Sequence, residues 1–308
     1  MDHAVGAGEF SGFSHLRGNE VRNGRFWGQV TGANGQVQGR NDLGSFGYQL
    51  GQFTIGMDVV GDADENLGFY LSAGSSSMDE HDIVNQELSS EDVGFGIYGH
   101  KAFGSGWQLT GATGVSFGNA ESVRYMPATI GSFTGGTARS EFDTQSFYAS
   151  ARVHRAYELE GNSGGWTLYP SLGMTYAHTR TERITENGGG DFNYEIAPAT
   201  AESFVGSPGI DFGRSFNFNG LPSAVTLSLH YEYDALAQNR SAHEIQVTSP
   251  LFGTFNQVGQ NRGPHTIKAG FNGAISLTDN MQLGVGYEYS KHTHGDEHGV
   301  GFNLTAPW

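Results

Sequence analysis

The densest group of potential metal ligands lies near the C-terminus. His292, His294, Asp296, Glu297 and His298 fall within seven residues, and imidazole and carboxylate groups are common ligands of transition metals. A tight, solvated hairpin also tolerates such residues, and the sequence shows no partners that would orient the imidazoles. We therefore expect a polar turn here, with no metal and no cofactor.

Two further patterns suggest chemistry at first sight. Glu232 and Glu288 are carboxylates of the kind that act as an acid–base pair, but they lie in separate segments of the chain. The spacings Gly94-x-Gly96 and Gly284-x-Gly286 resemble part of a nucleotide-binding loop, yet neither opens a helix. We expect no enzymatic activity.

Composition narrows the class of protein. The 308 residues include 48 glycines and no cysteine, which excludes a disulfide framework and a zinc–thiolate site. With 21 phenylalanines and 13 tyrosines the chain has enough apolar surface to fold, and its formal charge of −16 argues against a nucleic-acid partner.

No run of about 18 apolar residues is present that would make a transmembrane helix. Residues 1–6 do not resemble a signal peptide, so we expect an export signal further upstream or already removed.

The clearest pattern is an alternation of apolar and polar residues. Met281, Leu283, Val285, Tyr287 and Tyr289 interleave with small or polar residues, and a period of two gives a strand one dry and one wet face. No long segment has helical periodicity. Twelve such runs, each of about ten residues, begin near the following positions: Arg25, Gln49, Asn66, Glu91, Gly106, Glu141, Gly165, Ala201, Ala224, His265, Asn280 and Gly295.

The connections between these runs alternate in length. The short ones are 61–65, 103–105, 160–164, 217–223 and 278–279, and the long ones are 35–48, 77–90, 119–140, 181–200 and 235–264. Short turns on one side and long loops on the other are typical of an outer-membrane barrel. Strands of a soluble sandwich are nearer five or six residues, whereas about 9 to 11 are needed to cross a bilayer. The sequence therefore predicts an all-β protein, a transmembrane antiparallel β-barrel of twelve strands.

Strand parity predicts which side chains face the lumen. A basic residue facing lipid at mid-membrane costs about 2–4 kcal/mol, and the charged residues all fall on the wet face: Asp58, Arg152, Asp211, Glu232, Lys268 and Glu288. Their expected role is to set the electrostatics of the pore. Glycine and serine fill most other inward positions, for example Gly96 and Gly114, so we expect an open lumen that holds water or an inserted segment.

Tryptophans support the membrane interpretation. Trp107 and Trp166 each follow a short turn, and Trp308 ends the chain, so all three are expected at the periplasmic rim as an aromatic girdle. Trp27 lies at the same level but has the parity of the lumenal face.

Several short motifs resemble a known family. Arg25-Phe26-Trp27-Gly28-Gln29-Val30, Phe53-Thr54-Ile55-Gly56-Met57-Asp58, Leu67-Gly68-Phe69-Tyr70, Gly96-Ile97-Tyr98-Gly99 and Tyr169-Pro170-Ser171-Leu172-Gly173 occur in the order and spacing of the translocator domain of classical autotransporters. The resemblance covers residues 24–308. It implies type V secretion, in which a monomeric barrel anchors in the Gram-negative outer membrane and accompanies export of its own N-terminal passenger.

The resemblance also assigns roles to the two ends of the chain. Residues 1–23 would be the linker to the passenger, which in the family runs through the pore, often as a helix. No Asn-Asn pair of the kind some members use for self-cleavage occurs there. In the family the last strand is read by the barrel-assembly machinery, after delivery by periplasmic chaperones. The corresponding residues here are Val300, Phe302, Leu304 and Trp308, although Pro307 precedes the terminal aromatic.

Three alternatives remain within the barrel class. A stand-alone channel or porin would use residues 1–23 as a periplasmic tail, and an adhesin would bind a host surface through residues 235–264. Outer-membrane phospholipases also have twelve strands and place a histidine two residues before a nucleophilic serine. No His-x-Ser occurs in this sequence, which argues against that enzyme.

Overall fold

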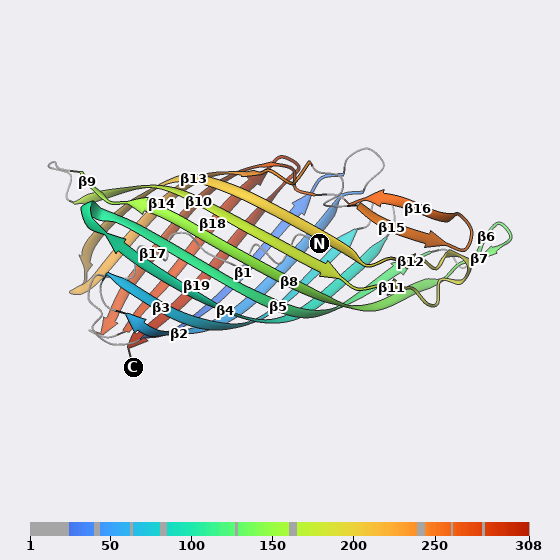
Figure 1. The fold of residues 1–308 in the computed structure, drawn as a ribbon, viewed down its shortest axis with the longest axis horizontal. Helices are drawn as coiled ribbons and strands as arrows, with labels where there is room; N and C mark the ends of the chain where they lie inside the picture. Colours follow the sequence, from blue (N-terminus) through green and yellow to red (C-terminus); the bar gives the residue numbers. More distant parts are fainter. Residues whose placement is uncertain are drawn as a thin grey trace.

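The chain folds as a closed antiparallel barrel of twelve strands, as the sequence predicts. The computed structural model describes residues 25–39, 44–61, 64–80, 85–126, 129–159, 165–238, 244–259, 261–278 and 281–307. The predicted linker, residues 1–23, and Trp308 lie outside these ranges. Figure 1 shows the strands tilted around the long axis of the barrel. The barrel strands are β1 (Arg25–Val37), β2 (Phe46–Gly61), β3 (Glu65–Glu80), β4 (Gln86–Phe103), β5 (Trp107–Tyr125), β8 (Thr137–Arg155), β10 (Trp166–Thr181), β13 (Ala199–Phe218), β14 (Leu221–Asp234), β17 (His265–Thr278), β18 (Met281–His292) and β19 (Gly295–Pro307).

The two ends of the barrel sheet pair with each other. β1 lies antiparallel to β19 along its whole length, from Arg25 opposite Pro307 to Val37 opposite Gly295. Every other strand pairs with the barrel strands before and after it in sequence. A closed sheet has no edge whose peptide groups would lack hydrogen bonds in hydrocarbon.

The short connections lie at one end of the barrel, on the left in Figure 1. Between β13 and β14 only Asn219 and Gly220 form the turn, and Phe218 pairs directly with Leu221. Both turn residues have positive φ, 51° and 84°, as a two-residue turn of type I′ requires. The β4–β5 connection is a short 3₁₀ turn, η2 (Gly104–Gly106), and a short strand, β9 (Tyr157–Leu159), extends the sheet at the same end.

The strands are longer than the predicted ten residues, and this expectation was wrong. They run from 12 residues in β18 to 20 in β13. Half of the predicted loop 119–140 belongs to barrel strands, because β5 continues to Tyr125 and pairs with β8 as far as Thr137. Beyond the apolar band the outward face becomes polar, as at Glu121, while the inward face buries both apolar and polar residues, such as Ala120 and Arg124. The alternation that marks a strand in the sequence therefore disappears although the backbone pairing continues.

Two other predicted loops also contain strands. They form a four-stranded sheet of β11 (Ile184–Thr185), β12 (Glu195–Ile196), β15 (Glu244–Ser249) and β16 (Gly253–Val258), next to η3 (Gly190–Phe192). A separate small hairpin pairs β6 (Thr129–Ile130) with β7 (Phe133–Thr134). All lie at the right-hand end in Figure 1. A buried ion pair between Arg124 and Glu186 joins this region to β5, and the Arg124 guanidinium lies 4.1 Å from the centre of the Tyr194 ring.

The outer wall is covered by large apolar side chains. Leu229 and Phe302, for example, are 53% and 54% exposed, and each of the twelve barrel strands carries at least one exposed large apolar residue. Such a continuous apolar surface is unfavourable in water and suits a hydrocarbon solvent. Among the residues that the structure describes, no helix is long and apolar enough to span a bilayer.

The inner wall is fuller than the sequence suggested. The expected gaps at inward glycines are occupied by the side chains of neighbouring strands. The Tyr70 ring lies over Gly96 and Gly114, where a Cβ atom would collide with its hydroxyl group, and Tyr70 also hydrogen-bonds Tyr148. The glycines therefore make room for inward aromatic rings, which the count of small residues alone did not reveal.

Replacing Gly96 with valine should destabilise the barrel by about 1–3 kcal/mol, because the new side chain collides with the Tyr70 ring and with the backbone oxygen of Thr113. Gly206→Val is the matched control, since a Cβ at Gly206 meets nothing within 4 Å. The thermal midpoint of unfolding in detergent is the measurement. Equal midpoints for the two variants would contradict this account of the glycine.

Candidate functional site: the inner wall of the barrel

The structure places all six predicted lumenal charges on the inner face. Glu232 illustrates the pattern, since it lies between Tyr231 and Tyr233, which point outward and are 41% and 44% exposed. Asp211 is fully buried, and its neighbour Phe212 is on the outer wall. The charges lie on β2, β8, β13, β14, β17 and β18 and fall into three groups.

The first group is centred on Lys268 of β17. Its Nζ lies 3.1 Å from Oε1 of Glu232 on β14 and 3.5 Å from Oε1 of Glu288 on β18. The three side chains are between 17% and 27% exposed. Glu232 and Glu288, which the sequence offered as a candidate acid–base pair, are thus separated by a single cation that they share.

The second group joins β8, β13 and β14. His230 Nε2 lies 2.9 Å from Oδ1 of Asp211, and Nη1 of Arg152 lies 3.1 Å from His230 Nδ1. Because a guanidinium only donates, Nδ1 must accept, and the proton on Nε2 is donated to Asp211. The His230 ring packs over Gly209. The sequence analysis missed His230, although it has the inward parity of Glu232.

The chemistry open to this group is limited by its contacts. An Asp–His pair orients a general base in many hydrolases, where the other ring nitrogen faces a nucleophile. Here that nitrogen faces Arg152, whose Nη1 also lies 3.4 Å from Ser171 Oγ. The arrangement is therefore suited to holding charges in place along the wall.

The third group lies near the opposite wall. Trp27 points inward, and its Nε1 donates to the Tyr98 hydroxyl at 2.7 Å. Tyr98 in turn donates to the Asp58 carboxylate, and the Trp27 and Tyr98 rings meet edge to face at 5.6 Å. The three residues connect β1, β2 and β4 across the lumenal surface.

Comparison with known proteins decides what kind of barrel this is. A family profile described as the autotransporter beta-domain matches residues 26–288. The chain belongs to this family. It is an integral outer-membrane barrel, the translocator domain of an autotransporter, and the family implies a linked passenger domain. No curated protein sequence matches the chain.

Solved structures of autotransporter barrels share the fold. The translocator domain of NalP from Neisseria meningitidis has a TM-score of 0.73 at 13% identity, with 96% of this chain and 92% of that chain covered. The transport unit of AIDA-I from Escherichia coli gives 0.64 at 11% identity, covering 94% and 91%. The beta domain of BrkA from Bordetella gives 0.61 at 14% identity, covering 93% and 100%. The family membership favours a translocator over the stand-alone channel that the sequence left open.

The predicted girdle residues of this translocator lie at the short-turn end. Trp107 is 41% exposed and directly follows η2, and Trp166 begins β10 half-buried. The guanidinium carbon of Arg155 lies 5.6 Å from the centre of the Trp107 ring, and that of Arg214 lies 5.8 Å from the centre of the Trp166 ring. The sequence analysis did not single out these arginines, although each is directly opposite its tryptophan in the strand register.

The predicted assembly residues of the last strand face outward. Val300, Phe302 and Leu304 are 48%, 54% and 44% exposed on β19. They are part of the apolar outer wall.

The histidine-rich hairpin between β18 and β19 has side chains on opposite faces. His292 points inward and is 5% exposed, and its Nδ1 lies 2.8 Å from Oγ1 of Thr266. His298 is on the outer wall, and its Nδ1 lies 2.8 Å from the hydroxyl oxygen of Tyr287. Among the described residues, no three histidine, aspartate or glutamate side chains are grouped as metal ligands.

Substitution of Lys268 tests the first charge group. Lys268→Met leaves Glu232 and Glu288 without their shared cation. We expect the free energy of unfolding to fall by about 2–4 kcal/mol. This is near the lower end of the values for breaking a buried ion pair, because the three groups keep some hydration. The triple variant Lys268→Met/Glu232→Gln/Glu288→Gln should regain most of this stability. Urea-induced unfolding in detergent measures both. A triple variant no more stable than the single one would contradict the pairing argument.

Proposed function

We propose that the inner wall is the path along which the passenger crosses the outer membrane as an extended polypeptide, and that the barrel itself catalyses no reaction. The observation that supports this most directly is the distribution of charge. Most of the predicted charges of the wall lie in groups of mixed sign: Lys268 pairs with two glutamates, and Arg152 is joined to Asp211 through His230. A wall of paired charges stays hydrated without holding a passing chain by one strong attraction.

The polar wall also meets the needs of an unfolded chain in transit. Extended backbone carries an unsatisfied donor and acceptor at nearly every residue. Tyrosine hydroxyls and carboxylates of the wall offer exchangeable partners for these groups. Tyr98 and Asp58 are such groups near the short-turn end, and Tyr48, which donates to Glu297 at 2.6 Å, is one near the loop end.

The contacts of the candidate catalytic groups support the absence of catalysis. Both ring nitrogens of His230 are engaged, by Asp211 and by Arg152. Glu232 and Glu288 share Lys268 instead of facing a common substrate position. We place residues 1–23 as the linker that joins the barrel to the passenger and occupies the lumen.

We further propose that the barrel-assembly machinery recognises the outward row Val300, Phe302 and Leu304 after periplasmic chaperones deliver the chain. β19 is the last strand and must pair with β1 to close the sheet. An apolar row on this strand is therefore a suitable signal of a complete chain. The closed sheet leaves no barrel edge for a second copy, which supports a monomer.

Planar-bilayer conductance tests the linker. A chain lacking residues 1–23 should conduct several-fold better than the 308-residue chain, because a strand or helix in the lumen displaces conducting water. Matched insertion levels and a folded, heat-modifiable barrel serve as controls. Equal conductance would refute occupation of the lumen by this segment.

Serine substitutions test the assembly signal. Phe302→Ser/Leu304→Ser should lower the amount of barrel assembled in cells about tenfold, while refolding of the same variant in detergent micelles changes little. The matched control, Phe271→Ser/Leu283→Ser, removes similar outward apolar area from β17 and β18. If the control is lost from the membrane to the same extent, the effect is loss of lipid contact and the recognition proposal fails.

A further inference from the structure

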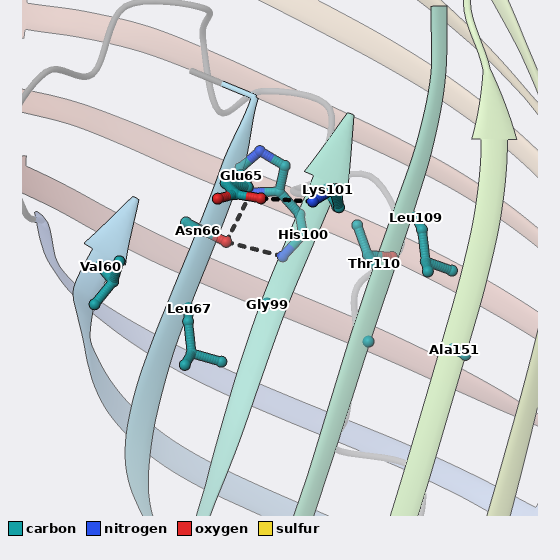
Figure 2. A pocket seen from close by; sticks show the side chains of 11 residues that line it. Val60, Glu65, Asn66, Leu67, Gly99, His100, Lys101, Leu109, Thr110 and Ala151 are labelled. Atoms are coloured by element: carbon teal, nitrogen blue, oxygen red, sulfur yellow. Dashed lines mark hydrogen bonds and ion pairs between the residues drawn. The ribbon is translucent and has the colours of Figure 1, made fainter. Parts of the chain in front are cut away.

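A groove interrupts the apolar outer wall near the short-turn end. Its volume is about 570 Å³. The floor consists of Gly99, Gly111 and Ala151, which are directly opposite one another on β4, β5 and β8. Figure 2 shows Leu67 on the neighbouring strand β3 and Leu109 on β5 itself, both beside this floor. Three small residues in one row across the sheet leave a recess among larger side chains.

The groove opens toward the membrane. Leu67, which is opposite Gly99, is 52% exposed, and Leu109 is 42% exposed. At the far end of the row Met174 is opposite Ala151 and is 53% exposed. These residues belong to the lipid-facing surface, so the recess must be filled by hydrocarbon, because an empty gap forfeits the dispersion contacts of its lining.

An arginine lies next to the groove on the side of the turns. Arg155 is four residues beyond Ala151 on β8, on the same face of the strand. Its guanidinium lies over the rings of Trp107, at 5.6 Å, and Tyr157, at 4.7 Å. Its Nε is buried and has no hydrogen-bond partner. In the part of the chain that the structure describes, no carboxylate forms an ion pair with Arg155, so none of the described carboxylates neutralises its charge.

A lysine lies on the other side of Trp107, two residues closer to the groove, since Phe103 is opposite Trp107 and Lys101 is opposite Leu109. Lys101 on β4 lies beside the groove and pairs with Glu65 at 2.8 Å (Figure 2). Both side chains of this pair are more than half exposed, and exposed ion pairs of this kind are weak and open readily. Lys101 is thus able to turn toward an anion that reaches the groove.

We propose that this groove binds one anionic phospholipid of the periplasmic leaflet. One acyl chain lies along Gly99, Gly111 and Ala151, and the phosphate accepts hydrogen bonds from Arg155 and from Lys101. Trp107 lies between the two cations at the level of the glycerol backbone. Short turns mark the periplasmic side of the barrel, and the leaflet on that side is made of phospholipid. Charge complementarity favours an anionic headgroup, since no described carboxylate pairs with Arg155 and its Nε has no hydrogen-bond partner.

The barrel contains its own comparison site. Arg214 lies over Trp166 at the same rim and likewise has no ion pair among the described residues. The outward residues next to this pair are large, however, since Phe212 is the neighbour on β13 and Leu168 is opposite it on β10. An arginine–tryptophan pair is therefore present there without a recess for an acyl chain.

Native mass spectrometry of the 308-residue chain in detergent tests the proposal. Palmitoyl-oleoyl phosphatidylglycerol should form a one-to-one adduct in preference to the ethanolamine lipid with the same chains. Arg155→Gln should weaken this adduct about tenfold, as expected for loss of a charge-assisted hydrogen bond. Arg155→Lys should retain much of the binding, and Arg214→Gln should change it less than twofold.

A second variant tests the groove separately from the charge. Ala151→Phe fills the floor and should weaken binding of the long-chain lipid about tenfold, while binding of dihexanoyl phosphatidylglycerol should be unchanged. Ala151→Leu is the substitute if the phenylalanine variant does not give a heat-modifiable barrel. Equal binding of the glycerol and ethanolamine lipids would overturn the proposal. Equal effects of Arg155→Gln and Arg214→Gln would also overturn it, because they would show general attraction to the rim without a site.

Discussion

Backbone hydrogen bonding in a solvent that offers no hydrogen bonds is the constraint on which this structure depends. A peptide group left unpaired in hydrocarbon costs several kcal/mol, so a sheet in a membrane must close on itself. Closure here joins β1 to β19, whose residues are far apart in the sequence, as in the pairing of Phe26 with Ala306. Contacts of such long range form late and slowly. A chain with this topology therefore depends on reaching the membrane with both terminal strands intact.

The same constraint divides every strand into two surfaces with different energetics. Outward residues exchange water for lipid, which favours leucine, valine and phenylalanine. Inward residues exchange bulk water for a confined space in which an isolated charge is poorly hydrated. This favours ion pairs between side chains of opposite charge. Asp211 is fully buried beside His230, and Lys268 lies between two glutamates. The lumen is polar, yet its charges are largely satisfied by one another.

Much of the fold was readable from the sequence because a period of two is a local signal. Alternation around Val285 and Tyr287 identifies both the strand and its lipid face without any knowledge of its neighbours. The pairing of side chains is not local. That Glu232 and Glu288 share Lys268 depends on the register of β14 with β17 and of β17 with β18, which no single strand encodes. The filled lumen was missed for the same reason, since the contact between Tyr70 and Gly96 depends on the pairing of β3 with β4.

The polar ends of the strands were missed for a different reason. Residues 119–125 carry polar side chains such as Glu121 on the outward face, while the inward face buries the mixed set Ala120, Ser122 and Arg124, so hydropathy carries no period. The backbone continues to pair because stopping would expose peptide groups without any gain. The barrel wall thus projects past the membrane and supports the small sheet of β11, β12, β15 and β16.

The two faces of one strand allow separate functions at adjacent positions. Ala151 lies on the outer groove and Arg152 hydrogen-bonds His230 inside the barrel, although they are consecutive residues. Arg155 lies at the membrane rim three residues further along. A substitution at Ala151 alters the lipid contact without touching the lumen, and one at Arg152 does the reverse. Because a barrel wall is one residue thick, lipid contact and passenger transit are separated by the direction of a side chain and not by distance along the chain.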